Sequence, residues 1–329
     1  MAPVVGIRAW PRPVLLACAT LLVAGVYYAA GRLGLSQQLT ADGAVVTPIW
    51  PPTGLALACL LLFGPWCVPG IALGALLVVL SLGNAGPETV GIVAGNTAAP
   101  VCAWLMLRAV GFRLSLSRLR DGLALVFLGA LVAMLISSGT GVGMLLVSGK
   151  LPMEHLGIVW LAWWVGDAVG VVLVTPLLLL LYRARLPPPS ARWAEAAGLT
   201  VVVGVLVPLI MYSSVSVMFL TFPILILTAL RFQLAGGIPC ALFASVMATV
   251  TARQGAGSFG RLTEIETMVK LQAFNGTLGL TALLLSSVIS EQLNTRRSVE
   301  RACQELVEAL QHLNAGGPGG PGTPGADAR

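Results

Sequence analysis

The sequence predicts an all-α membrane protein: a polytopic bundle of about eight to ten transmembrane helices followed by a short cytoplasmic C-terminal helix. Of the 329 residues, 57% are hydrophobic and only 10% are charged, whereas about 25% are charged in a soluble domain. Apolar windows of about 20 residues, the length that crosses about 30 Å of hydrocarbon, recur along the whole chain. The net charge of +6 is therefore a signal of membrane topology and does not indicate nucleic-acid binding.

Ten apolar windows are candidate spans. Many spans follow the first window, so we interpret it as an uncleaved first span and not as a signal peptide. The fifth window contains SSGTGVG, where we expect the end of the helix to be unwound, and the sequence GPWCVPG joins the second and third as a helical hairpin. The windows cover residues 14–30, 47–63, 66–83, 88–107, 122–147, 157–182, 196–213, 216–231, 234–252 and 267–290.

The charges between the windows predict the orientation. With a cytoplasmic N-terminus, thirteen Lys and Arg residues fall on the inner side and five on the outer side. Cytoplasmic loops are enriched in these residues, so we expect an even number of spans and both termini in the cytoplasm. Eight spans fit nearly as well as ten if two windows are re-entrant.

Four regions follow from this topology. Residues 1–13 form a cytoplasmic N-terminus and residues 14–292 the membrane domain, which the proline-rich link at 183–196 divides into six-span and four-span parts. Residues 293–314 predict a cytoplasmic amphipathic helix, and the Gly/Pro-rich residues 315–329 a disordered tail.

The amphipathic helix carries a short apolar seam. Its apolar residues step by 4, 3, 4 and 3, which is the a/d spacing through which helices pair, although two heptads fall short of the three or four that indicate a coiled coil firmly. We expect self-association or partner binding through this seam, which consists of Val299, Cys303, Leu306, Leu310 and Leu313.

Asp167 is the most informative single residue. Trp160, Trp163, Trp164 and Asp167 are spaced i, i+3, i+4, i+7 and share one helical face. Asp167 lies about ten residues, or ~15 Å, into its span. A carboxylate at that depth costs about 2.5–3.5 kcal/mol on insertion scales and indicates a functional site by default. The alternative is an interhelical hydrogen bond, with the tryptophans as anchors.

Three further polar residues lie at a similar depth. Asn96, Gln272 and Asn275 are ~8–12 Å below the outer surface on helices that run inward. A single polar residue in a span is usually a helix–helix contact worth about 0.6 kcal/mol. Four polar residues at one depth, counting Asp167, favour a cavity.

Trp50, Pro51 and Pro52 precede the second window. Proline is tolerated in the first turn of a helix, so Pro51 and Pro52 can begin a span partway into the membrane. We expect Trp50 to project toward the polar layer and these three residues to form the rim of a ligand pocket. The alternative is an interfacial tryptophan on a rigid loop. Arg231 ends the eighth window and is most simply a cytoplasmic anchor, but it pairs with Asp167 if that span is short or tilted.

Motifs for catalysis and metal binding are missing from the sequence. The six cysteines form no CxxC pair, and the two histidines lack a second ligand at metal spacing. The sequence contains no nucleotide-binding loop, GxSxG, HExxH or paired-carboxylate motif. We expect no metal, no cofactor and no catalytic residue, and we regard a membrane enzyme as the least favoured of three functions.

Several segments, in order along residues 44–292, resemble the bacterial membrane-associated sensor family MASE of the first type. They include PIWPPTGLALACLLLFG, AGNTAAPVCAWLMLRAVGF, WWVGDAVGVVLVTPLLL and LQAFNGTLGLTALLLSSVISEQ. The combination of WPPxG with WWxGD is specific. The resemblance implies a sensory input domain in the bacterial inner membrane, which relatives fuse to kinase, cyclase, phosphodiesterase or phosphatase modules. About 38 residues follow Glu291, too few for such a module, so we expect no output domain.

The expected function is signal input. A small ligand would occupy the polar layer, and the last span would carry the change to a cytoplasmic kinase, phosphatase or cyclase, as in two-component systems. The alternative is a transporter-like carrier of a small solute, because ten spans with Gly/Pro interruptions and midplane polar groups are typical of secondary transporters.

Overall fold

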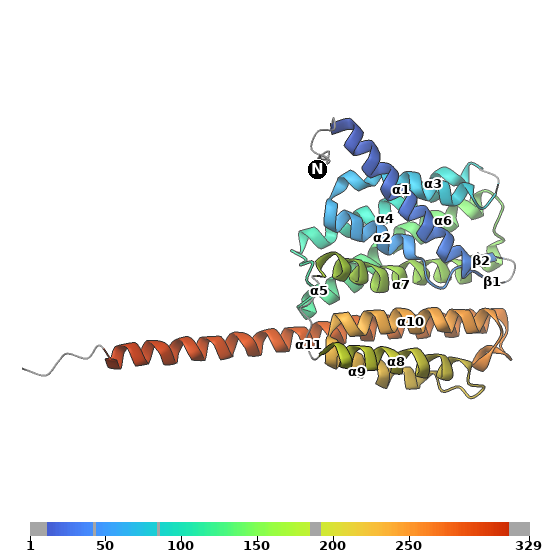
Figure 1. Cartoon of the computed structure of the whole chain (residues 1–329). Helices are drawn as coiled ribbons and strands as arrows, with labels where there is room; N and C mark the ends of the chain where they lie inside the picture. Colours follow the sequence, from blue (N-terminus) through green and yellow to red (C-terminus); the bar gives the residue numbers. More distant parts are fainter. Residues whose placement is uncertain (1–11, 42–43, 84–85, 185–191, 316–329) are drawn as a thin grey trace, which may run out of the picture.

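The computed structural model describes residues 12–41, 44–83, 86–184 and 192–315. Within these ranges the chain is a helical bundle with one small β-hairpin (Figure 1). In chain order the elements are α1 (Arg12–Ser36), β1 (Leu39–Ala41), β2 (Ala44–Val46), α2 (Pro51–Phe63), η2 (Pro65–Cys67), α3 (Val68–Leu80), α4 (Glu88–Ala109), α5 (Leu119–Ala124), the π-helix η3 (Leu125–Val132), α6 (Ala133–Val147), η4 (Met153–His155), α7 (Leu156–Arg183), α8 (Arg192–Tyr212), η5 (Met218–Leu220), α9 (Thr221–Phe232), α10 (Leu234–Arg253), η6 (Gly257–Phe259) and α11 (Glu264–Ala315).

The helices confirm the predicted fold class of a polytopic helix bundle. Seven of the described helices are long and apolar enough to cross a membrane, and three shorter apolar helices cover Pro51–Phe63, Pro65–Leu80 and Met218–Phe232. Each of these ten segments coincides with one predicted window. The 13 residues of α2 extend only about 20 Å, less than the ~30 Å hydrocarbon core.

The β-hairpin was not predicted. Strands β1 and β2 are antiparallel, with Leu39 opposite Val46 and Ala41 opposite Ala44. The hairpin precedes a non-helical segment that leads into α2, so the second helix begins later than the apolar window at residue 47.

The bundle has two parts that meet along α7. In the first part α1 packs on α3, α4 on α6 and α2 on α7, and in the second α10 packs on α8, α9 and α11. Helix α7 also contacts α10 and α11, which joins the parts (Figure 1). The predicted division therefore falls after α7, at a link of which residues 185–191 lie outside the described ranges.

The expected unwinding at SSGTGVG is wrong. These residues lie in the regular helix α6, where the hydroxyls of Ser138 and Thr140 donate to the carbonyls four residues earlier at 3.1 and 2.6 Å. Gly141 packs against Trp163, whose ring would lie 2.8 Å from an added Cβ. Packing and hydrogen bonds thus hold the glycine-rich turn helical, and the irregularity lies earlier, in the π-helix at 125–132.

The last span and the expected amphipathic helix are one element. Helix α11 runs unbroken for 52 residues, about 78 Å, and projects from the end of the bundle at which α1 begins (Figure 1). The predicted boundary at 292–293 is therefore not a break in the helix. On the projecting part Val299, Leu306 and Leu310 are 57%, 63% and 57% exposed, and Cys303 is exposed. The side chain of Leu313 and residues 316–329 lie outside the description.

Candidate ligand site between α2, α6 and α7

A non-helical segment, residues 47–50, lies directly against α7 before α2 begins. The backbone N–H of Trp50 donates to the carbonyl of Gly166 at 3.0 Å. A Cβ on Gly166 would lie 2.5 Å from the Thr47 carbonyl oxygen, and one on Gly170 would lie 2.1 Å from that of Trp50. A Cβ on Gly54 would likewise lie 2.2 Å from the Gly170 oxygen. Three glycines therefore allow this segment and α2 to approach the backbone of α7.

The two prolines begin α2 as the sequence suggested. Pro51 and Pro52 occupy its first positions, with Trp50 as the N-cap residue. Gly166, which accepts the Trp50 bond, lies ten residues into α7, or ~15 Å from its start. The start of α2 is therefore level with the middle of a membrane-spanning helix. Non-helical backbone at that depth is tolerated only where it is buried in protein or lines a water-filled cavity, and here it packs on α7.

Asp167 is completely buried where these elements meet. The hydroxyl of Thr53 on α2 donates to Asp167 Oδ1 at 2.6 Å. The other oxygen, Oδ2, has no hydrogen-bond partner among the described residues. Ser137 of α6 and Trp163 of α7 are close enough to interact with the carboxylate. Oδ2 thus has polar neighbours on α6 and α7 but no hydrogen bond from any described residue.

Tyr27 of α1 adds a fourth helix to this group. Its side chain is 1% exposed and packs in one apolar cluster with Trp50, and it lies within electrostatic range of Asp167. Trp50 therefore packs beside a residue near the buried polar group, and its role as the rim of a ligand pocket stays a prediction. Tyr27 was not predicted, because nothing in an apolar first span indicates which of its side chains faces inward.

Ser137 connects two predicted residues. The indole N–H of Trp163 donates to Ser137 Oγ at 3.3 Å, and the hydroxyl of Ser137 donates to Asn96 Oδ1 at 3.4 Å. Asn96 in turn donates to the carbonyl of Ile92 at 2.9 Å. Asn96, Trp163 and Asp167 therefore belong to one polar group, which we call the Asp167 cluster together with Thr53, Ser137, Trp50 and Tyr27. The serines of SSGTGVG were the signal for Ser137.

Trp164 points to a different neighbour. Its indole donates to the carbonyl of Leu131 at 2.8 Å, inside the π-helix, and its ring stacks on Trp160 with centroids 5.7 Å apart. Adjacent residues of a helix are separated by about 100° around its axis. Trp163 and Trp164 therefore contact different parts of the 119–147 helix, and Trp164 lies outside the Asp167 cluster.

Gln272 and Asn275 form a separate polar location on α11. Gln272 donates to the carbonyl of Ala162 on α7 at 2.7 Å. Asn275 is completely buried, and neither its amide nitrogen nor its oxygen has a hydrogen-bond partner among the described residues. The single layer that depth alone predicted is thus divided into two groups.

Arg231 lies apart from both groups. Its Nη1 is 3.1 Å from Glu195 Oε1, its side chain is 61% exposed, and its carbonyl accepts from Arg192. The pairing with Asp167 that a short or tilted span would have allowed does not occur. The ion pair with Glu195 of α8 holds Arg231 at the end of α9, and its role as a cytoplasmic anchor stays a prediction.

The comparison with protein families decides the assignment. The MASE1 family model matches residues 19–293. This chain belongs to the MASE1 family. MASE1 domains are membrane sensory domains and not catalytic ones, so this is a multi-pass membrane protein with a sensory domain. No curated protein and no solved structure matches the chain.

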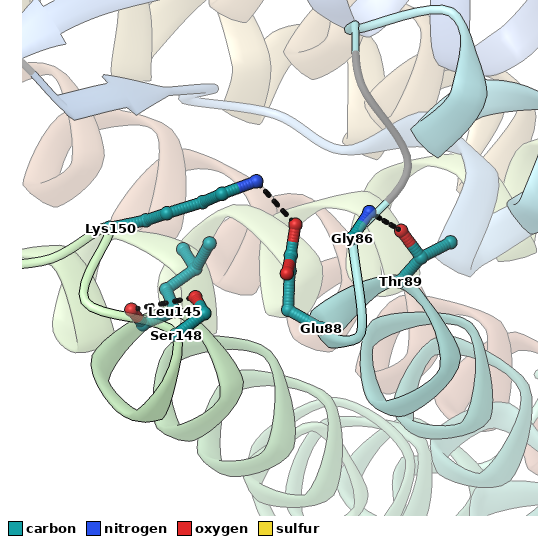
Figure 2. Close-up of polar contacts among 6 residues, drawn as sticks. All are labelled: Gly86, Glu88, Thr89, Leu145, Ser148 and Lys150. Atoms are coloured by element: carbon teal, nitrogen blue, oxygen red, sulfur yellow. Dashed lines mark hydrogen bonds and ion pairs between the residues drawn. The ribbon is translucent and has the colours of Figure 1, made fainter.

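One ion pair of this MASE1 domain was missed by the sequence analysis. Glu88 is only 4% exposed at the first residue of α4, and Lys150, in the loop after α6, donates to its carboxylate (Figure 2). Beside it the backbone N–H of Gly86 donates to Thr89 Oγ1 at 3.2 Å (Figure 2). The ion pair connects the start of α4 to the loop after α6. Asn96 lies eight residues further along α4 than Glu88, or about 12 Å.

The Asp167 cluster contains hydrogen-bonding hydroxyls, an amide, indoles and one carboxylate, which are groups that can bind a polar ligand. Among the described residues no three His, Cys, Asp or Glu side chains gather as a metal site requires.

Proposed function

We propose that this MASE1 protein is a signal-input protein of the bacterial inner membrane with both termini in the cytoplasm. A small ligand with a hydrogen-bond donor binds Asp167 Oδ2. The bound state is then passed through α11 to a cytoplasmic partner. The observation that carries the proposal is the unpartnered Oδ2 of a completely buried carboxylate.

Burial makes this atom informative. A polar atom removed from water without a hydrogen bond costs free energy, and buried polar atoms are almost always paired. A donor supplied by a ligand would remove that cost. Because the cluster draws residues from α1, α2, α4, α6 and α7, occupancy would favour one packing of these helices over another. A ligand shifts such an equilibrium only by its difference in affinity for the two states.

Two side-chain hydrogen bonds of α11 are suited to pass a change from the Asp167 cluster to this helix. Near the middle of the membrane domain Gln272 of α11 holds the α7 backbone at Ala162, five residues before Asp167. Where α11 leaves the bundle, Glu291 Oε2 accepts the backbone N–H of Leu119 at 2.9 Å. A change at α7 or in the 119–147 helix would therefore move α11, whose helix continues without a break into the projecting part.

The projecting part offers a surface for the next partner. Exposed apolar residues in a row on a solvated helix usually form an interface. We propose that Val299, Cys303, Leu306, Leu310 and Leu313 pair with a second copy or with a helix of a cytoplasmic kinase, phosphatase or cyclase.

Asp167→Asn tests the binding role. The background is a variant in which the other five cysteines are replaced and Cys303 is kept. In native membranes its rate of disulfide formation between copies reports how the α11 helices lie relative to each other. We expect Asp167→Asn and Ser137→Ala to change this rate at least about twofold. Thr200→Val is the matched control, since Thr200 is an exposed hydroxyl that bonds within α8. Rates equal to wild type in both cluster variants, at normal membrane levels, would sink the proposal.

A transporter-like carrier is the second candidate. It is favoured by one observation: α2 begins level with the middle of α7 beside a buried carboxylate, as the interrupted helices of secondary transporters do. Solute uptake into proteoliposomes that depends on Asp167 would favour the carrier, and uptake equal to empty liposomes would favour the sensor.

A further inference from the structure

A recess lies away from the Asp167 cluster, at the end of the bundle from which α11 projects. It has a volume of about 730 Å³. One wall is the segment before α5, and the other is α11 just beyond the last apolar residues. The polar groups that line it include Arg113, Ser117, Arg118, Asn294, Thr295 and Ser298.

The cationic groups of this recess are largely unused. The guanidinium groups of Arg113 and Arg118 have no ion-pair or hydrogen-bond partner within the described ranges. Arg120, also in the lining, donates to the Val110 carbonyl at 3.2 Å. The lining contains one carboxylate, Glu291, and its Oε2 accepts the Leu119 N–H. The recess therefore has an excess of positive charge.

The backbone that presents these arginines is held in place. Asp121 Oδ1 accepts the backbone N–H of Arg113 at 3.2 Å. Leu116 has a φ of 49°, a conformation that non-glycine residues rarely adopt, and its side chain is 1% exposed in the core. Such residues persist where the surroundings hold them, and they concentrate at binding sites. The arginines thus extend from a fixed loop.

We propose that this recess binds a phosphate-bearing anion, the head group of an anionic lipid or a soluble phosphate compound. Guanidinium groups bind phosphate oxygens through two parallel N–H bonds, and Ser117, Asn294 and Thr295 supply further donors. In the proposed orientation the recess faces the anionic inner surface of the membrane, which attracts clustered arginines. The anion joins the α5 segment to α11, so it regulates the helix that carries the signal.

The regulatory role rests on the proposed function, but binding of the anion does not depend on the Asp167 cluster, so failure of one site leaves the other standing. The test uses the full chain in an uncharged detergent with two probes. Labelled inorganic pyrophosphate is followed by equilibrium dialysis, and phosphatidylglycerol by native mass spectrometry. We expect one probe to bind saturably with one anion per chain, and Asp167→Asn to bind as wild type does.

The variants assign binding to the recess. Arg113→Gln/Arg118→Gln removes two charges, and Ser298→Trp fills the recess from the exposed surface of α11 without changing charge. We expect both to weaken binding at least tenfold. Arg301→Gln, an exposed arginine on α11 outside the lining, is the control and should stay within twofold of wild type.

Binding of pyrophosphate would identify a soluble phosphate as the ligand type, and retention of phosphatidylglycerol alone would identify a lipid head group. The proposal is overturned if neither probe binds wild type. It is also overturned if the two recess variants bind like wild type, or if Arg301→Gln loses as much affinity as they do, because the arginines would then be membrane anchors only.

Discussion

The Thr53 hydroxyl donates a 2.6 Å hydrogen bond to Oδ1 of Asp167, joining α2 to α7 across 114 residues of sequence. Both side chains are buried, so the bond forms where water does not compete. It also orients the carboxylate, whose Oδ2 receives no hydrogen bond from the described residues. The rotation of Asp167 and the position of α2 are therefore determined by the same contact.

Replacing Thr53 tests this bond. Thr53→Val keeps the shape of the side chain but leaves Oδ1 without its donor, and an unpaired buried polar atom costs about 1–3 kcal/mol. We expect a lower thermal unfolding midpoint for the detergent-purified protein. Thr53→Ser keeps the hydroxyl and should lose less stability. A larger loss in Thr53→Ser than in Thr53→Val would show that packing of the methyl group, and not the hydrogen bond of the hydroxyl, stabilises this contact.

The glycines of α7 give a second prediction. An added Cβ on Gly170 would lie 2.1 Å from the Trp50 carbonyl oxygen, so Gly170→Ala must displace the start of α2. Overpacking of a tight core typically costs about 1–3 kcal/mol. Gly139→Ala on α6 is the matched control, because no atom lies within 4 Å of its added Cβ, and alanine favours a helix over glycine by up to about 1 kcal/mol.

Unfolding in mixed micelles of increasing SDS content measures both glycine variants. The midpoint should fall for Gly170→Ala and stay or rise for Gly139→Ala. A fall of the same size in both would mean that the loss in Gly170→Ala does not come from the close approach to the Trp50 carbonyl.

Apolar window length predicted the helices but not their rotation. Each window corresponds to a helical segment because crossing hydrocarbon requires a fixed length. Depth along a span likewise follows from counting residues, which is how Asn96, Asp167, Gln272 and Asn275 were grouped. Ala162, which binds Gln272, and Asp167 are about 140° apart around α7. The two groups therefore contact different neighbours, and only packing determines that direction.

The π-helix at 125–132 was beyond sequence analysis for a related reason. It has no proline and reads as an ordinary apolar helix. Its consequence is tertiary, since the Leu131 carbonyl accepts the Trp164 indole at 2.8 Å. By contrast, Pro51 and Pro52 specify the start of α2 through their own covalent geometry, so that position could be predicted.

The Glu88–Lys150 ion pair gives a third prediction. Lys150→Met removes the only charged partner that the described residues provide for a nearly buried carboxylate, and Glu88→Gln removes the charge itself. We expect Lys150→Met to lower the thermal unfolding midpoint more than Glu88→Gln/Lys150→Met together, because the double variant leaves no uncompensated carboxylate. A double variant as unstable as the sum of the single ones would show that the two groups act independently.

The exposed seam on α11 gives the fourth prediction. If two copies pair in parallel through Val299, Leu306 and Leu310, the Cys303 sulfurs of both copies face each other at an a position. Mild oxidation of membranes should then produce a disulfide-linked dimer, which Cys303→Ser abolishes and Cys18→Ser, on exposed α1, does not. Leu306→Lys/Leu310→Lys should suppress cross-linking at least fivefold through charge repulsion, whereas Glu308→Lys, off the seam, should not. Cross-linking that survives the double lysine variant would mean that the copies meet through their membrane domains, and the seam would then be available for a different partner.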